Sequence, residues 1–206
     1  MRLNPESNTQ VPKKLVIITG SSGTGKSTLA QALGKDLGCP VVSKDIYASV
    51  FPASHGLEYE EKYRPEVYEL IQKVIIVLLS RGCDVVADVV YSKEVQIPGW
   101  NGLIEWHQQT AKRYNAIVEF IRVVVPEKTL RGYLIGRGSQ FDNDKLSSPE
   151  GWNSFMREQP IYINTHPANG LVVRNDRPFT ETFAEVKTFL SRPLYQRPSQ
   201  IYQVVY

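Results

Sequence analysis

A glycine-rich turn between an apolar run and an amphipathic segment constrains this chain more than any other feature of its sequence. The apolar run, residues 14–19 (KLVIIT), is continuous and rich in β-branched residues, which is typical of a strand buried on both faces. Residues 20–25 form the turn, and leucines at positions 29, 33 and 37 then mark one face of a helix over residues 26–37. Gly38 is expected to end that helix in a left-handed conformation. A strand, a turn and a helix in this order predict one unit of an α/β fold.

Further apolar runs alternate with helical patterns along the rest of the chain. We expect additional strands at residues 40–43, 84–90, 116–125 and 171–174. We expect additional helices from Pro65 to the residues before Gly82, at 102–114, at 126–135 and at 180–190. This alternation predicts a three-layer α/β fold in which helices cover both faces of a five-stranded parallel sheet. Such sheets bind ligands beyond the carboxyl ends of their strands, so polar residues directly after a strand are the first candidates for a site.

The chain has 206 residues, a length that favours one domain. We place this domain at residues 13–190, between a flexible N-terminus at 1–12 and a C-terminal tail at 191–206. Residues 136–169 hold several glycines and prolines among polar residues, and we expect an irregular or short-helical insert there. This insert is the expected lid of the domain.

Composition excludes several classes of protein. With 42% hydrophobic and 22% charged residues, the chain has neither a disordered nor a coiled-coil composition. Its formal net charge of +3 is too small to indicate nucleic-acid binding. The longest aliphatic run, residues 74–79, is far shorter than a membrane helix, and residues 1–12 lack the apolar centre of a secretory signal. The two cysteines, Cys39 and Cys83, are too few for a disulfide framework, so we expect a cytoplasmic protein that does not contact a membrane.

The turn matches the pattern G-x-x-x-x-G-K-[ST] at every fixed position (GSSGTGKS, residues 20–27). Glycines let the backbone turn so that successive N–H groups face phosphate oxygens, and the N-terminus of the following helix adds partial positive charge. The Lys26 ammonium can reach the β- and γ-phosphates, which makes it the first candidate catalytic residue. The alternative is a glycine-rich turn without a ligand. The residues expected to bind a nucleoside triphosphate are Gly20, Ser21, Ser22, Gly23, Thr24, Gly25, Lys26, Ser27 and Thr28.

A magnesium ion is the expected cofactor beside the phosphates, and it needs a hydroxyl and an acidic residue near the turn. The Ser27 hydroxyl can ligate the ion. Asp84 and Asp88 lie at opposite ends of the third predicted strand, and only Asp88 lies at its carboxyl end. We therefore expect Ser27 and Asp88 to hold Mg²⁺, Asp88 through a water molecule. The alternative for Asp88 is an ordinary aspartate in a turn.

Asp45 directly follows the second predicted strand (VVSKD, residues 41–45) and so lies at the same edge of the sheet. A carboxylate at this place can orient an acceptor hydroxyl and take its proton while the new phosphorus–oxygen bond forms. The competing interpretation is an N-cap of a helical turn that starts near Ile46, and the two roles are compatible.

With these residues the chain resembles the small P-loop kinases known as predicted AAA-type ATP-dependent kinases, whose relatives include polynucleotide kinase, zeta toxins and chloramphenicol phosphotransferase. The matching segments are GSSGTGKST (20–28), VVSKD (41–45), DVVADVVYS (84–92) and FIRVVVPEKTLRGYLIGRG (120–138). The resemblance implies a P-loop NTPase fold and transfer of the γ-phosphate from ATP, with Mg²⁺, to a hydroxyl. It also implies that Asp45 binds the acceptor and that Arg131 and Arg137 are catalytic lid arginines that act on the transferring phosphate.

The expected acceptor is a small molecule that bears a hydroxyl group. The family often places an arginine shortly after the Asp45 position, and this chain has IYASV at residues 46–50, which disfavours a polynucleotide acceptor. Two alternatives remain open. One is a nucleotide-dependent hydrolase or switch with water as acceptor and a macromolecular partner, and the other is a toxin-like kinase of a nucleotide sugar.

Weaker candidates lie near the same edge of the sheet. Arg122 lies within an apolar strand and needs a carboxylate or phosphate partner. The loop at residues 174–177 could contact the adenine base by analogy of fold. Aromatic and basic residues could line an acceptor pocket, although such residues more often serve packing. They are Tyr59, Tyr63, Arg64, Trp100, Trp106 and His107.

Overall fold

The computed structural model describes residues 11–51, 63–90, 102–139, 142–157 and 170–193. The predictions for Tyr59, Trp100 and most of the two terminal segments therefore lie outside the described residues. No helix within these ranges combines the length and the apolar character that crossing a bilayer requires.

Within the described residues, five strands form one parallel sheet, which confirms the predicted fold class. The spatial order of the strands is β2-β3-β1-β4-β5. The strand before the glycine-rich turn is therefore central, and the turn opens at the middle of the carboxyl edge. The strands are β1 (Lys13–Thr19), β2 (Val41–Ser43), β3 (Val85–Asp88), β4 (Ala116–Val124) and β5 (Leu171–Arg174).

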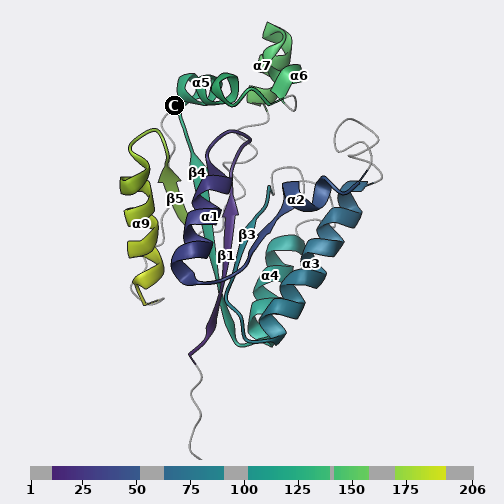
Figure 1. Ribbon diagram of the computed structural model, residues 1–206, viewed down its shortest axis with the longest axis vertical. Coiled ribbons are helices and arrows are strands. Elements are labelled where there is room, and N and C mark those ends of the chain that lie inside the picture. The colour runs from purple at the N-terminus through teal and green to yellow at the C-terminus, as the bar shows by residue number, and fades with distance from the viewer. Residues whose placement is uncertain (1–10, 52–62, 91–101, 140–141, 158–169, 194–206) are drawn as a thin grey trace, which may run out of the picture.

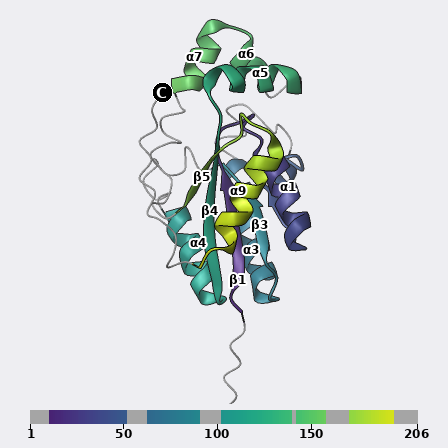
Figure 2. The ribbon, with the colours of Figure 1, turned by 90° about the vertical axis from the view of Figure 1, so that its left-hand side faces the viewer.

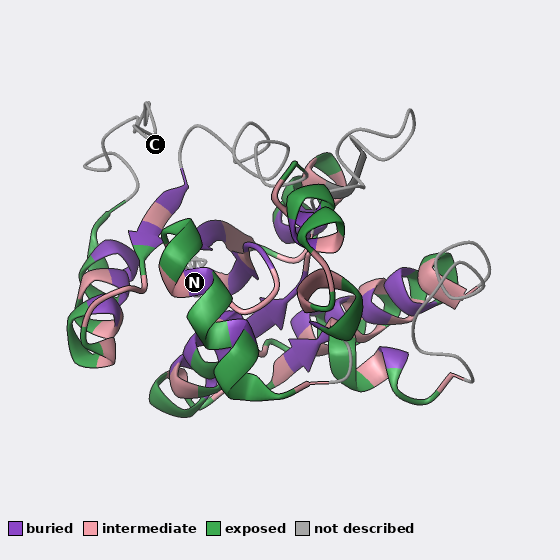
Figure 3. Ribbon diagram, turned by 90° about the horizontal axis from the view of Figure 1, so that it is seen from above, coloured by how far each residue is buried: buried purple, intermediate pink, exposed green. Residues whose placement is uncertain are grey.

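Helices cover both faces of the sheet (Figure 1, Figure 2). One face is covered by α1 (Lys26–Leu37) and α9 (Phe179–Ser191), and the other by α2 (Lys44–Ala48), α3 (Arg64–Ser80) and α4 (Gly102–Arg113). In the view from above, the strands are largely buried and the outward faces of the helices are exposed (Figure 3).

Side chains of β1 alternate between the two apolar cores. Val16 and Ile18 pack with residues of α1 and α9, whereas Leu15 and Ile17 pack with residues of α3. All four side chains have no exposed surface. A continuous apolar run is therefore required here, because each side of the strand faces a core.

Three further helices lie above the carboxyl edge of the sheet (Figure 1). They are α5 (Glu127–Arg137), α6 (Asn143–Leu146) and α7 (Pro149–Arg157), and we call them the lid. The lid has its own apolar cluster, formed by Leu130 and Leu134 of α5 and by Trp152 and Phe155 of α7. Helices α6 and α7 lie within residues 136–169, where the sequence predicts an irregular or short-helical insert.

Helix α5 ends two residues later than the sequence predicts. Gly136 does not stop it, and the chain leaves the helix at Gly138, whose φ of 59° is left-handed. Glycine inside a helix costs about 1 kcal/mol relative to alanine. Burial of Leu130 and Leu134 on one face of α5 offsets that cost, because tertiary packing supplies most of the stability of a short helix.

Strand β3 is shorter than predicted at both ends. At its start, the Asp84 carboxylate accepts a hydrogen bond from the backbone N–H of Lys14 (2.9 Å), so Asp84 joins two strands instead of pairing within the sheet. At its end, the pairing with Ile18 of β1 and with Ser43 of β2 stops at Asp88. Asp88 is thus the last residue of the strand, at the carboxyl edge.

Candidate active site

The glycine-rich turn approaches its neighbours too closely for larger residues. Gly20 has a φ of 137°, and a Cβ atom there would lie 2.3 Å from the carbonyl oxygen of Val123 in β4. A Cβ atom at Gly23 would lie 2.4 Å from the Leu134 side chain of the lid. Helix α1 begins directly after the turn, and no side chain among the described residues caps its N-terminus. Its first N–H groups are therefore available to an anion at the carboxyl edge.

We expect Gly20→Ala to destabilise the protein and Gly132→Ala to stabilise it. Backbone strain at Gly20 should cost about 1–3 kcal/mol, and the contact with Val123 adds to it. At Gly132, inside α5, no atom lies within 4 Å of an added Cβ, so the substitution should add about 0.5–1 kcal/mol of helix stability. Chemical denaturation of both variants measures the two changes. Equal stability of the two variants would contradict the close approach at Gly20.

Lys26 is buried at the first position of α1, with 8% of its surface exposed. Its ammonium donates a hydrogen bond to the backbone carbonyl of Ser21 (2.8 Å), and the Thr24 hydroxyl donates to the same oxygen (2.9 Å). Burial lowers the pKa of Lys26, and the negative charges of Asp88 and Asp45 partly oppose that effect. The turn therefore holds a buried ammonium group whose charge is influenced by two carboxylates at the same edge of the sheet.

Asp88 and Ser27, the two predicted magnesium ligands, lie together at the end of β3 and the start of α1. The Asp88 carboxylate interacts with the Ser27 hydroxyl and accepts a hydrogen bond from the Ser43 hydroxyl (3.4 Å). Asp88 is 5% exposed, and this burial raises its pKa, while the nearby Lys26 ammonium opposes the increase.

A carboxylate and a hydroxyl side by side fit a hard cation such as Mg²⁺. In the described part of the chain, no cluster of three or more His, Cys, Asp or Glu side chains could hold a metal ion. An ion at Ser27 and Asp88 would therefore need phosphate oxygens or water as its remaining ligands. This is the usual arrangement for Mg²⁺ beside a nucleotide.

Asp45 lies in the first turn of α2, and its side chain is 79% exposed. Helix α2 begins at Lys44, with Ser43 at the N-cap position, so the competing prediction of an Asp45 N-cap is wrong. The Ser43 hydroxyl caps no backbone group and instead faces Asp88. The Asp45 carboxylate is close enough to influence the pKa of both Lys26 and Asp88, and it is open to solvent. It is thus the accessible acidic group of the site.

The structure separates the two arginines that the resemblance assigns to the lid. Arg137, at the end of α5, donates a hydrogen bond from Nη2 to the Ser22 hydroxyl of the turn (3.1 Å). The Arg131 guanidinium instead lies 5.3 Å from the centre of the Trp152 ring on α7. Six residues along a helix turn through about 600°, so the two side chains leave α5 on different sides. Of this pair, Arg137 is the one brought to the turn, and Arg131 packs within the lid.

The sequence analysis named the loop at residues 174–177 only as a group and did not single out Asn175, which the structure places at the site. Asn175 follows β5, and its side-chain amide donates a hydrogen bond to the carbonyl of Thr24 in the turn (2.9 Å). The Tyr133 hydroxyl of the lid donates to the backbone carbonyl of Asn175 (3.1 Å). Asn175 therefore joins the turn to the lid. A polar residue directly after a parallel strand was the signal that could have found it.

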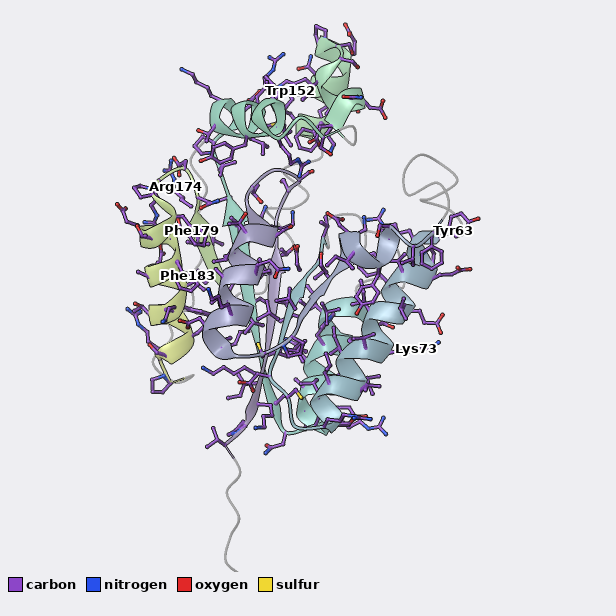
Figure 4. The ribbon with its side chains drawn as sticks, in the orientation of Figure 1. Tyr63, Lys73, Trp152, Arg174, Phe179 and Phe183 are labelled. Atoms are coloured by element: carbon purple, nitrogen blue, oxygen red, sulfur yellow. The ribbon has the colours of Figure 1, made fainter. Side chains whose placement is uncertain are left out.

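The other weak candidates divide between core and surface. His107 is buried, and its ring meets Trp106 edge-on, so these two residues belong to the packing of α4. Tyr63 packs against Phe51 (5.5 Å between ring centres) at the start of α3. Figure 4 shows Tyr63 and Arg174 on opposite sides of the carboxyl edge. The Arg174 guanidinium forms a double hydrogen bond with Asp176.

Comparison with known families and structures is consistent with this geometry. The family model AAA_33, described as an AAA domain, matches residues 15–156. A search of the curated proteins finds no significant match.

Solved structures share the fold at low sequence identity. A candidate kinase from Chloroflexus aurantiacus J-10-fl has a TM-score of 0.62 and 18% identity over 88% of this chain and 100% of that chain. Shikimate kinase from Bacteroides thetaiotaomicron has a TM-score of 0.56 and 14% identity over 86% and 98%. A gluconokinase from Sinorhizobium meliloti 1021 has a TM-score of 0.55 and 19% identity over 88% and 93%. These likenesses confirm the predicted P-loop fold.

Proposed function

Since the chain belongs to the AAA_33 family of AAA domains, we propose that it is a kinase that transfers the γ-phosphoryl group of ATP to a hydroxyl of a small molecule. One observation supports this above the others: Lys26, the Ser27–Asp88 pair and the exposed Asp45 carboxylate meet at one edge of the sheet, around the glycine-rich turn. Solved structures with the same fold include a shikimate kinase and a gluconokinase, whose names specify small acceptors with hydroxyl groups.

In the proposed reaction, the acceptor oxygen forms a bond to the γ-phosphorus while the bond to the β,γ-bridging oxygen breaks, and ADP leaves. Backbone N–H groups of the turn and the Lys26 ammonium bind the phosphates and stabilise the charge on their oxygens. Asp45 orients the acceptor hydroxyl and accepts its proton, which then passes to solvent. Arg137 contacts the turn from above and stabilises the charge that spreads over the γ-phosphoryl oxygens.

Ser27 and Asp88 would hold Mg²⁺ beside the β- and γ-phosphates, where the ion neutralises phosphate charge when it is bound. Asp88 is fixed for this role by the hydroxyls of Ser27 and Ser43. The side-chain carboxylate of Asp45, by contrast, is exposed and can meet a molecule that enters from solvent.

A panel of acceptors tests the proposed function. Purified protein is incubated with ATP, Mg²⁺ and sugars, nucleosides, antibiotics or oligonucleotides with free ends, and ADP formation and acceptor mass are measured. We expect one class of small hydroxyl compound to increase ADP formation and to gain one phosphoryl group. If ADP formation increases only with a macromolecule, or occurs at one rate with every acceptor, the protein is a switch or hydrolase instead.

The pH dependence of kcat/KM for MgATP should be bell-shaped and narrow. Burial raises the pKa of Asp88. As the pH falls, Asp88 is therefore protonated at a higher pH than an ordinary aspartate, whose pKa is about 3.9. Burial lowers the pKa of Lys26. As the pH rises, Lys26 therefore loses its charge at a lower pH than an ordinary lysine, whose pKa is about 10.4. Since kcat/KM reports the free enzyme, both limbs should move toward neutrality.

The Asp88→Asn variant provides the control for the acidic limb. Its amide side chain does not titrate, whereas the nucleotide titrates in the same way with both proteins. A difference between the two acidic limbs therefore comes from residue 88. We therefore expect the acidic limb of this variant to be displaced to lower pH, at a lower overall rate. An identical acidic limb in both proteins would show that Asp88 does not control it.

A further inference from the structure

Asp142, between α5 and α6, has no exposed side-chain surface, yet it carries a carboxylate. One of its oxygens accepts hydrogen bonds from Nε and Nη2 of Arg137, the first at 3.0 Å. The other oxygen accepts a hydrogen bond from the Lys145 ammonium at 2.7 Å. Asp142 occupies the N-cap position of α6, but its side chain caps no backbone N–H. Its two carboxylate oxygens instead accept hydrogen bonds from the side chains of Arg137 and Lys145.

Arg137 is held from two sides. Its Nη2 donates both to Asp142 and to the Ser22 hydroxyl, so the same guanidinium connects the lid with the glycine-rich turn. Charge-assisted hydrogen bonds to a carboxylate fix the plane of a guanidinium more firmly than neutral ones do. The two cations and the single carboxylate leave one positive charge in excess beside the turn.

We propose that Asp142 is a positioning residue that holds the Arg137 guanidinium against the glycine-rich turn, in the place where it acts on the transferring phosphoryl group. This inference rests on the proposed kinase function and adds to it a residue outside the expected site. Lys145 balances the second oxygen of Asp142, and its ammonium also lies 5.4 Å from the centre of the Phe155 ring in the lid core. Through Lys145, the contact between Asp142 and Arg137 is thus connected to the packed core of the lid.

The charge of Asp142 gives the proposal a distinctive consequence. A negative group near the phosphates weakens nucleotide attraction, so its removal should leave ATP binding equal or tighter. A guanidinium that is no longer fixed, however, stabilises the transition state poorly, and a misplacement of about 1 Å can cost about 100-fold in rate. Asp142 should therefore affect kcat and KM differently.

The test compares Asp142→Asn with Asp144→Asn, which removes the same charge from an exposed position in α6. We expect Asp142→Asn to lower kcat by about 10- to 100-fold, with a KM for ATP within about threefold of wild type or below it. Asp144→Asn should match wild type in both constants. In an Arg137→Ala background, Asp142→Asn should lower kcat by less than about twofold, because the residue acts through Arg137.

A spectroscopic measurement tests the same contact without turnover. The Nε–H of Arg137 donates to Asp142, so its NMR signal, assigned by its loss in Arg137→Lys, should exchange slowly with water in wild type and in Asp144→Asn. It should exchange fast in Asp142→Asn. If the asparagine variant melts below the assay temperature, Asp142→Glu keeps the charge, and we expect a smaller loss of kcat in the same direction.

Several outcomes would overturn the inference. They are an unchanged kcat in Asp142→Asn, an equal loss of kcat in Asp144→Asn, and a full additional loss in the Arg137→Ala background. A different outcome contradicts the proposed kinase function: the wild-type protein transfers phosphate to none of the acceptors. In that case the NMR exchange of the Arg137 signal still decides whether Asp142 holds the guanidinium.

Discussion

Lys26→Ala is expected to abolish phosphate transfer, with a loss in kcat of about 1,000-fold or more. The ammonium is buried at the start of α1, where its charge is little screened by water and faces the turn. A coupled assay for ADP, with the acceptor found in the panel, measures the loss.

Lys35→Ala is the matched control for this prediction. Lys35 lies in the last turn of the same helix, is exposed, and is far along α1 from the turn. We expect wild-type kcat in this variant. Because Lys26 also donates a hydrogen bond to the Ser21 carbonyl, the melting temperature of Lys26→Ala must be compared with that of wild type. A folded Lys26→Ala protein with more than a tenth of wild-type kcat would refute the assigned role.

Asp45→Ala is expected to remove transfer and to spare ATP binding. Loss of a general base costs about 100- to 10,000-fold in rate, whereas the phosphates contact the turn and not α2 in the proposed reaction. Since the Asp45 side chain is 79% exposed, its loss should also leave the melting temperature unchanged. Titration calorimetry with ATP and an assay of acceptor phosphorylation measure the two effects separately.

Glu66→Ala is the control for Asp45. Glu66 is an exposed acidic residue in the first turn of α3, as Asp45 is in the first turn of α2. We expect this variant to transfer phosphate at the wild-type rate. Full turnover in Asp45→Ala would show that another group takes the proton, and a large loss of ATP affinity would show that Asp45 acts on the nucleotide instead.

Much of the fold follows from local patterns in the sequence. Helix α1 spans the predicted residues 26–37, and Gly38 ends it with a φ of 63°. The burial of Leu15, Val16, Ile17 and Ile18 was evident from an uninterrupted apolar run. The predicted ends of helices and strands are less accurate. At the end of α5, tertiary packing overrides the low helix propensity of glycine, and at the end of β3 the pairing with the neighbouring strands stops before the apolar run does.

The sequence by itself determined the place of the glycine-rich turn between β1 and α1 and the carboxyl-edge positions of Asp45 and Asp88, because a glycine-rich turn and the order of parallel strands are local and topological properties. Only the tertiary structure decided that Arg137, and not Arg131, contacts the turn, and that Asp142 and Asn175 support it. The direction of a helical side chain depends on which face of the helix is packed. The pKa shifts of Lys26 and Asp88 likewise depend on burial by residues that are distant in the chain.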